Sequence, residues 1–597
     1  MTDTAISHNL KCMRKIIFFG LLLFPLLKLA FAQESWLLLI DDPLYRQAEE
    51  LFICNGVVPP YEELPLTAEN LKSELLNLIS RIDDSSQLMN LYDLVERLKL
   101  SFGNIKPLVE LGLASGINTE TDRFAQIPTY WGGEDNWVSG IGDNEPDDGR
   151  PLRNFIPFYD VLALPKLASL GFILQVGPWA LHGEAELKKT CSALLQSDVF
   201  FWSIPENMDE LDICNTSFNA TINYYSPNFE VSFGRSKLHY GPGQYSTLSV
   251  SKTMPYFDYV RGRLRYEGFS LYTTVISLNP VISNMESEYL DYLYEKNLNP
   301  EPNAPFNGKI FKDRLKNYIN IHFVWRPWPW LSLSFMQTNL VGGRPLDLAD
   351  FNPFLIIHNN FDEGTYSCPI LLAVSIVPFA GLRLSSDFLF YDAPVGDEIN
   401  DPSTTPGAIA LQGGFTLLST PFFTLGPGRF RLDAEITYVD PYAYGKYYDL
   451  RKFTSRFLFL DHDAFPGRYW LDFPLGFYLG PDCLDIHAVL SYGQASDWEV
   501  SLGWQSTGKG EIDLYGYGDD TEYVSRPSSG LAPSGVAQWT HALSLGFFFK
   551  PLPELTVRLW YRLSLVFNRF DPDSRTNIEG VNHIFHYMGL ACSFRFF

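Results

Sequence analysis

The sequence predicts a transmembrane antiparallel β-barrel that follows a small helical bundle. Three observations lead to this fold class. Strands with one apolar face recur along the chain, tight turns containing proline alternate with long polar loops, and the amino terminus carries an export signal. A closed barrel is expected because a bilayer offers no water to the edges of an open sheet. Each membrane strand needs about 10 residues plus its share of turn and loop, which leaves room for about 16 to 18 strands.

Residues 1–32 have the pattern of a secretory signal peptide. Basic residues precede an apolar run over residues 16–24, and an A-x-A cleavage site ends at Ala32. The run is too short for a transmembrane helix, and Pro25 interrupts it. We therefore expect a cleaved signal and export to the outer membrane of a Gram-negative-type bacterium, with the barrel assembly machinery and outer-membrane lipid as partners.

The charge and the cysteines narrow the range of partners and covalent links. The chain has a net charge of −24, and removal of the basic signal region leaves −27. Nucleic acid is therefore not an expected partner, because it is itself a polyanion. Cys191 and Cys214 flank one loop, and they either form a disulfide in an oxidising compartment or stay unpaired. No cofactor is predicted.

Residues 33–104 are predicted to form a periplasmic α-helical bundle. Asp42 followed by Pro43 marks a first helix start, Thr67 begins a second helix, and a third runs from about Ser86. Each helix carries an apolar stripe at helical spacing. None is stable alone, so they should pack on one another and at the periplasmic mouth of the barrel. A partner-binding or peptidoglycan-binding module is the alternative.

Residues 105–597 are predicted to form the barrel with its long extracellular loops. The clearest hairpin spans 538–567, where the odd positions from 555 to 567 are all apolar and prolines mark the turn. The same strand, proline turn and strand arrangement recurs at 323–333, 377–384 and 425–432. The longer loops, expected to face outward, are 116–150, 190–220, 283–316, 340–367, 442–468 and 515–537.

Charged residues alternate on the polar faces of three strands, where they should line the lumen. Both signs are present, so the charges either line an aqueous path or pair across the lumen and fill it. We favour a blocked barrel. The positions are Arg261, Arg263 and Arg265, then Arg429, Arg431, Asp433 and Glu435, and finally Arg558 and Arg562.

The first long loop offers a candidate polysaccharide-binding site in Tyr130, Trp131 and Trp137, with Glu134 and Asp135 beside them. Aromatic rings stack on the apolar faces of sugars, and carboxylates accept hydrogen bonds from their hydroxyls. The alternative is that these aromatics belong to the interfacial girdle or pack the loop itself.

The same loop carries a weak calcium candidate in Asp143, Glu145 and Asp147. Carboxylate oxygens are calcium ligands, but the spacing is not that of an EF-hand, and a solvated acidic loop is the simpler interpretation. No metal site is therefore assigned. The histidines suggest no enzyme either, because the one dense cluster, at 461–463, has no nucleophile fixed beside it. No catalytic residue is predicted.

Four sequence blocks resemble the capsule assembly protein Wzi family. They are the first helix region at 42–56, Phe233-Gly234-Arg235 followed by Tyr240-Gly241-Pro242-Gly243, the stretch 433–444, and Pro474-Leu475-Gly476 through Leu479-Gly480-Pro481 before a strand pair. Tyr240 stands where the family usually has tryptophan. The blocks follow one another in the family's order and spacing.

The resemblance implies a largely occluded, monomeric barrel of about 18 strands. Such a protein binds capsular or exopolysaccharide as a lectin and helps to attach or assemble it at the cell surface. The barrel features alone fit equally well with a porin or a substrate-specific outer-membrane channel, so this alternative stays open.

Overall fold

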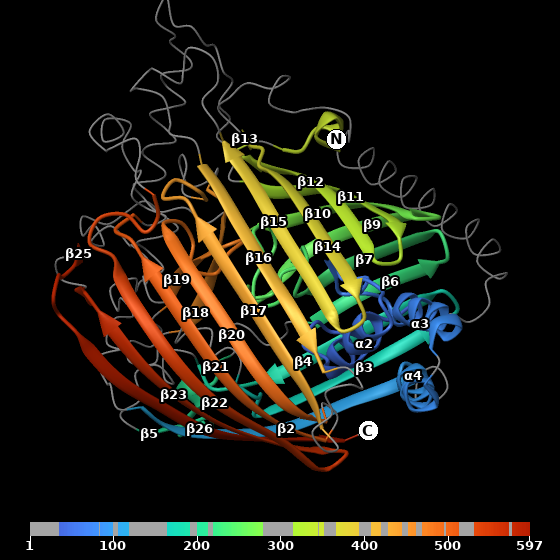
Figure 1. Cartoon of the computed structure of the whole chain (residues 1–597), viewed down its shortest axis with the longest axis horizontal. Helices are drawn as coiled ribbons and strands as arrows, with labels where there is room; N and C mark the ends of the chain where they lie inside the picture. The colour runs from blue at the N-terminus through green and yellow to red at the C-terminus, as the bar shows by residue number, and fades with distance from the viewer. Residues whose placement is uncertain are drawn as a thin grey trace, which may run out of the picture.

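Eighteen long antiparallel strands close into a barrel in the computed structural model (Figure 1). The structure describes residues 35–82, 84–99, 105–118, 164–190, 200–212, 219–278, 315–343, 345–351, 366–392, 408–419, 428–444, 452–460, 468–494, 497–512, 531–571 and 576–596. Within these ranges, no helix combines the length and the apolar character needed to cross a membrane. The predicted fold class is confirmed.

The first and last long strands pair and close the ring, with Val109 opposite Phe596. The barrel strands are β2 (Ile105–Asn118), β3 (Ala168–Val176), β4 (Trp179–Leu187), β6 (Asn219–Ser226), β7 (Phe229–Ser236), β9 (Phe257–Tyr266), β10 (Phe269–Leu278), β11 (Lys316–Trp328), β12 (Leu331–Gly342), β14 (Ile370–Phe379), β15 (Leu382–Asp392), β16 (Ala408–Leu418), β17 (Arg429–Val439), β20 (Cys483–Gln494), β21 (Trp498–Lys509), β22 (Gln538–Leu552), β23 (Leu555–Phe567) and β26 (His583–Phe596).

Several short elements accompany these strands. In the barrel sheet, β5 (Phe200–Trp202) and β13 (Tyr366–Ser367) extend the ladder, while β24 (Phe570–Asp571) and β25 (Thr576–Asn577) pair with each other. In the part of the chain that the structure describes, 3₁₀ turns lie at Ile79–Arg81, Met208–Glu210 and Leu348–Phe351.

The two ends of the barrel differ in the length of their connections. Proline-containing turns join β11 to β12 and β22 to β23, as the sequence pattern predicts. We call this the short-turn end, and the opposite end the long-loop end. In outer-membrane barrels the short turns lie on the periplasmic side.

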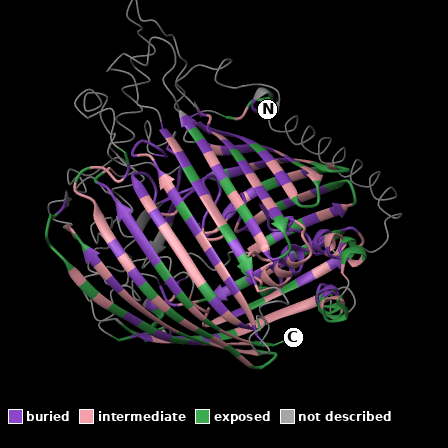
Figure 2. Cartoon of the chain, in the orientation of Figure 1, coloured by how far each residue is buried: buried purple, intermediate pink, exposed green. Residues whose placement is uncertain are grey.

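Side chains alternate between the two faces of each strand, as Figure 2 shows by the alternating burial along the ribbons. On β9, Val260 and Leu264 are 45% and 54% exposed on the outside, whereas Arg261 and Arg263 between them are 5% exposed. This is the pattern of a barrel with an apolar outer face and a polar inner face.

The three predicted helices precede the barrel, which confirms the predicted helical bundle. They are α2 (Pro43–Cys54), α3 (Ala68–Asn77) and α4 (Ser85–Arg97). Each has a side-chain cap, and the carboxylate of Asp42 accepts from the amide of Leu44 at 2.9 Å.

The helices pack on the inner wall at the short-turn end. Ile173 and Ala180 of the barrel belong to the same apolar cluster as α2, α3 and α4. The amide of Gly381, in the turn between β14 and β15, donates to the carbonyl of Ile53 at 3.0 Å, and Figure 1 shows α2 beside this turn. We call the described residues of 35–98 the amino-terminal plug.

A second body of chain fills the lumen towards the long-loop end. It consists of residues 237–256, which we call the lumen insert, together with the described residues of 440–482. The insert contains β8 (His239–Tyr240), and the second segment contains the hairpin of β18 (Thr454–Leu460) and β19 (Arg468–Pro474). Both pack in one apolar cluster with the inward faces of the barrel strands.

The prediction that residues 442–468 face outward as a loop is wrong for their described part. Tyr444 and Phe453 are 0% exposed, and they stack at 5.7 Å between ring centroids inside the barrel. The physical reason is their aromatic content, since large apolar rings are stabilised by removal from water and the lumen provides the space.

Candidate functional site in the barrel lumen

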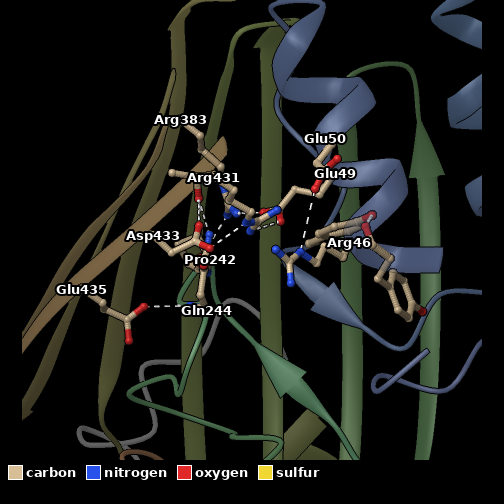
Figure 3. Close-up of polar contacts among 12 residues, drawn as sticks. Arg46, Glu49, Glu50, Pro242, Gln244, Arg383, Arg431, Asp433 and Glu435 are labelled. Carbon is tan, nitrogen blue, oxygen red and sulfur yellow. Dashed lines mark hydrogen bonds and ion pairs between the residues drawn. The ribbon is translucent and has the colours of Figure 1, made fainter. Parts of the chain in front are cut away.

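Glu49 of α2 forms the centre of a buried ion-pair cluster between the plug and the barrel wall (Figure 3). Its two carboxylate oxygens accept from Arg383 on β15 at 2.7 Å and from Arg431 on β17 at 2.6 Å. All three side chains are at most 8% exposed. Charge-assisted hydrogen bonds of this kind fix α2 against two strands at once.

Both arginines continue the network to further elements. Arg383 also donates to the carbonyl of Pro242 in the lumen insert at 3.0 Å. Arg431 also donates to Asp433 at 2.6 Å. Asp433 is two residues further along β17 and lies on the same face of the strand. The cluster therefore joins the plug, the insert and the wall.

The lumen insert has its own contact with β17 beside this cluster. The backbone amide of Gln244 donates to Glu435 at 2.8 Å (Figure 3), and the side chain of Gln244 donates to Thr416 on β16.

Arg46 of α2 pairs with Glu499 on β21 at 2.6 Å, which adds a further contact between the plug and the wall.

A second cluster holds the segment between α2 and α3. Glu62 accepts from the Nε of Arg326 on β11 at 3.0 Å and from the hydroxyl of Ser332 on β12. Glu63 contacts the Nδ1 of His322 at 2.8 Å, and both side chains are 0% exposed. These carboxylates bind the plug to β11 and β12, which are separated from the Glu49 contact on β15 by a single strand, β14.

The strand β9 supplies the third set of contacts with the plug. Arg261 donates to the carbonyl of Pro65 at 2.6 Å, and Arg265 donates to Asn70 at 3.2 Å and pairs with Glu74. Because β9, β11, β15, β17 and β21 all take part, the plug is held around the inner wall and not on one side.

The plug and the insert meet inside the barrel. Strand β1 (Glu63–Leu64) of the plug pairs antiparallel with β8 (His239–Tyr240) of the insert. The amide of Gly241 donates to the carbonyl of Glu62 at 2.9 Å, which extends this short ladder. Tyr240, at a position singled out by the sequence, is 0% exposed and bonds Thr274 on β10 at 2.9 Å.

The carboxylates of the plug are ionised in this environment. Burial acts to raise the pKa of Glu49, but Arg431 and Arg383 outweigh it, so that the pKa lies below its usual value. Burial and Arg326 act in the same opposed way on Glu62, and its pKa is also lowered. The ion pairs are therefore present at neutral pH.

The structure brings most of the sequence-predicted lumen charges together. Arg261, Arg265 and Arg431 contact the plug directly, and Arg263 pairs with Glu230 on β7 at 2.8 Å. Arg429 lies 3.9 Å from Glu50, and Arg562 donates to Gln505 at 3.0 Å. Arg558 is exposed, and its guanidinium lies 5.9 Å from the centre of the Phe548 ring.

The predicted loop sites lie outside the described residues. These are the polysaccharide candidates Tyr130, Trp131, Glu134, Asp135 and Trp137, the calcium candidates Asp143, Glu145 and Asp147, the cysteines Cys191 and Cys214, and the cluster at 461–463. Within the ranges that the structure describes, no group of three or more histidine, cysteine, aspartate or glutamate side chains is arranged to hold a metal ion.

Sequence reasoning missed Glu49, Glu62 and Glu63, the plug partners of the lumen arginines. One signal for Glu49 exists, because it lies beside Ala48 within the apolar stripe of α2, where an unpaired charge would be costly. No comparable signal marks Glu62 and Glu63.

Comparisons with known proteins agree with this geometry at the level of the fold. No protein-family model matches the chain, and no curated protein sequence matches it significantly. Among solved structures, it resembles Wzi of Escherichia coli, an outer-membrane protein involved in group 1 capsule assembly and described as a carbohydrate-binding β-barrel. The TM-score is 0.53 at 12% identity, over 93% of this chain and 99% of Wzi. The resemblance to the Wzi family is confirmed as a likeness of fold.

Two further solved structures are more distant. OccK5 (OpdH) of Pseudomonas aeruginosa has a TM-score of 0.36 at 10% identity, over 84% of this chain and 100% of that one. The channel DcaP of Acinetobacter baumannii has a TM-score of 0.31 at 9% identity, over 83% of this chain and 99% of that one. These values are too low to bear on function.

Proposed function

We propose that this protein is an outer-membrane barrel that binds capsular or exopolysaccharide and helps to attach or assemble it at the cell surface without conducting solutes. One observation carries the proposal: in the described residues, the lumen is filled from both ends by chain that meets at the β1–β8 ladder.

The filled lumen separates this barrel from a wide porin. A porin keeps an aqueous channel lined by its charged residues, whereas here the charges of β9, β11, β15 and β17 are used by the plug. The remaining functional surface is the long-loop end. The carbohydrate binding stated for Wzi, whose fold this chain shares, supports a glycan as the ligand.

The first long loop is the proposed polysaccharide contact. Trp131 and Trp137 supply the stacking surfaces, with Tyr130 beside them, and Glu134 and Asp135 supply acceptors for sugar hydroxyls. Binding at this loop would place the polymer outside the cell and leave the barrel as its anchor.

The test joins single-channel conductance in a planar bilayer with equilibrium binding of surface polysaccharide from the host. We expect no steady conductance and saturable binding that Trp131→Ala or Trp137→Ala weakens at least about tenfold, the effect of losing about 1.4 kcal/mol of contact. Trp330→Ala, at the short-turn end, is the matched control and should bind normally. Large steady conductance would reject the proposal.

A substrate-specific channel is the second candidate, favoured by one observation. Asp41 of the plug and Arg558 on the inner face of β23 remain exposed, with 68% exposure for the Asp41 side chain. Solvent therefore reaches part of the lumen. A small conductance that Arg558→Glu reverses in ion selectivity would establish this channel in place of the closed barrel.

A further inference from the structure

Three buried acceptor oxygens of one facing pair of residues on β15 and β16 have no hydrogen-bond donor among the described residues. They are both carboxylate oxygens of Asp387 on β15 and the amide oxygen Oε1 of Gln412 on β16. Asp387 is 1% exposed and Gln412 is 3% exposed, so water does not satisfy them from the bulk. The two residues are directly opposite each other in the β15–β16 ladder.

The orientation of the Gln412 amide is fixed by its other half. Its Nε2 donates to Glu435 at 2.7 Å, to the carbonyl of Ser246 at 3.1 Å and to Thr437 at 3.2 Å. Reversing the amide would set Oε1 against the carboxylate and the carbonyl, which are acceptors only. Oε1 is therefore the atom that lacks a donor.

The lumen insert lies directly over this pair of side chains. A Cβ added to Gly241 would meet Asp387 Oδ2 at 2.8 Å, and one added to Gly243 would meet Gln412 Oε1 at 2.6 Å. The Gly241-Pro242-Gly243 turn thus covers the unpaired oxygens and keeps solvent away from them.

The arginine on the same strand as Asp387 is already engaged with other groups. Arg383 donates hydrogen bonds from Nη1 to Glu49, from Nε to Ser375 and from Nη2 to the carbonyl of Pro242. The other charged or titratable groups on the packed elements include Glu435, Arg431 and Asp433 on β17, Glu49 on α2, and His239, Tyr240, Tyr245 and Lys252 in the insert. Arg431 is already paired with Glu49 and Asp433. Glu435 carries the same charge as an ionised Asp387 and opposes its ionisation.

We propose that Asp387 is protonated in the closed protein and donates its O–H to Oε1 of Gln412. One proton then gives Oε1 a donor, turns one Asp387 oxygen from an unpaired acceptor into that donor, and removes the negative charge from the other. The hydrogen-bond chain runs from Asp387 through Gln412 to Glu435, and the other oxygen of Glu435 accepts from the Gln244 amide at 2.8 Å. This chain clamps the insert to three adjacent strands.

The clamp makes closure of the lumen sensitive to alkali. Hydroxide removes the proton from Asp387 as water, and a second buried carboxylate then stands near Glu435 and under Gly241. The pair of negative charges and the lost hydrogen bond release the turn. Since the insert also carries β8, its release disengages the ladder with β1 of the plug.

Infrared difference spectroscopy of the whole protein in lipid tests the proton directly. We expect the carbonyl stretch of a protonated carboxyl group at neutral pH, lost in Asp387→Asn and lost from the wild type at alkaline pH. Asp485→Asn is the matched control, because this inward carboxylate on β20 already accepts from Thr507 at 2.6 Å and from Gln505 at 3.0 Å. The control should keep the band, and Glu435→Gln should move its alkaline loss to lower pH, because the charge that opposes ionisation of Asp387 is removed.

Conductance at alkaline pH provides the second measurement. Wild type should change from closed to conducting as the band disappears, while Asp387→Asn, which keeps a donor at this position, should stay closed. A carboxyl band unchanged by Asp387→Asn would overturn the proposal. So would one equivalent of a divalent cation that is retained by purified wild type and lost in Asp387→Asn, because the oxygens would then be metal ligands.

Discussion

Glu63 of the plug and Tyr240 of the lumen insert are opposite each other in a two-stranded sheet inside the barrel. The carboxylate of Glu63 lies 2.8 Å from His322 on β11, and the hydroxyl of Tyr240 bonds Thr274 on β10. Chain that enters from one mouth is therefore bonded to chain that enters from the other, and both are bonded to neighbouring strands of the wall. Closure of the lumen depends on this junction and on the ion pairs around it.

Glu49→Gln should loosen the plug more than any exposed charge substitution. It leaves Arg383 and Arg431 buried without their shared carboxylate, which costs about 3–5 kcal/mol. We expect faster proteolysis of residues 35–98 in the assembled barrel and frequent channel openings. Glu96→Gln removes only the exposed pair with Lys99 and should leave both measurements unchanged. Equal behaviour of the two variants would contradict the role of the Glu49 cluster.

Gly241→Ala should destabilise the insert through both backbone and side chain. Gly241 has φ of +121°, and the new Cβ would lie 2.8 Å from Asp387 and 3.3 Å from Thr247. The expected cost is about 1–3 kcal/mol, read as a lower unfolding temperature in lipid. Gly177→Ala, at φ +59° with no atom within 4 Å, isolates the backbone effect and should cost less. A larger loss at Gly177 would be inconsistent with the close packing over Asp387.

Removal of one ring from the lumen cluster should expose the hairpin of β18 and β19. Phe453 is 0% exposed and contacts the rings of Tyr318, Tyr391 and Tyr444. Phe453→Ala should cost about 3–5 kcal/mol and accelerate amide exchange in the described part of 440–482. Phe547→Ala, on the outer face with 39% exposure, is the control for loss of a ring and should not change exchange there.

Acid should weaken the ion pairs that hold the plug in the lumen. The pKa of Glu49 and of Glu62 is lowered in the fold, because the neighbouring arginines outweigh burial, so their contribution is complete above the usual carboxyl pKa and is lost as pH falls through the lowered value. Burial, with repulsion from Lys252, lowers the pKa of His239 to about 3.

His239 extends the loss of stability to higher pH than the carboxylates do. His239 is neutral in the insert, so the unfolded chain binds more protons once pH falls below the ordinary histidine pKa of about 6.5, and stability declines from there. Conductance measured from neutral pH to about pH 3 should therefore rise as pH falls. Glu49→Gln should reduce the part of the conductance rise that occurs below the usual carboxyl pKa. A wild-type conductance that does not change with pH would disprove the mechanism.

The wall of the barrel could be predicted from the sequence, whereas its contents could not. Period-two alternation and proline turns place hairpins such as 538–567, because these signals are local in the chain. The partners of Arg383 and Arg431 lie in α2, more than three hundred residues away, and no local pattern encodes that proximity. Alternation identified the inward face of Arg431 but could not identify Glu49 as the group that it meets.

The same limit explains the error at residues 442–468. Aromatic residues such as Phe453 and Phe457 are equally consistent with a loop packed outside the barrel and with a hairpin packed inside it. The choice depends on lumen space, which depends on the strand number and on the other inserts. Gly241 and Gly243 stand in one of the blocks that resemble the Wzi family, yet the reason for both glycines, close approach to Asp387 and Gln412, required the three-dimensional arrangement.

The pairing of β2 with β26 sets the order in which this molecule can be built. The seam joins the first and last long strands, so the ring is sealed only when the end of the chain is available. The plug precedes β2, and the lumen insert follows β7, so both are synthesised before the sealing strand. The plug and the lumen insert are therefore synthesised before β26 can pair with β2 and close the barrel. Assembly of this barrel ends with its seam, and the buried arginines of the inner wall have their partners at that moment.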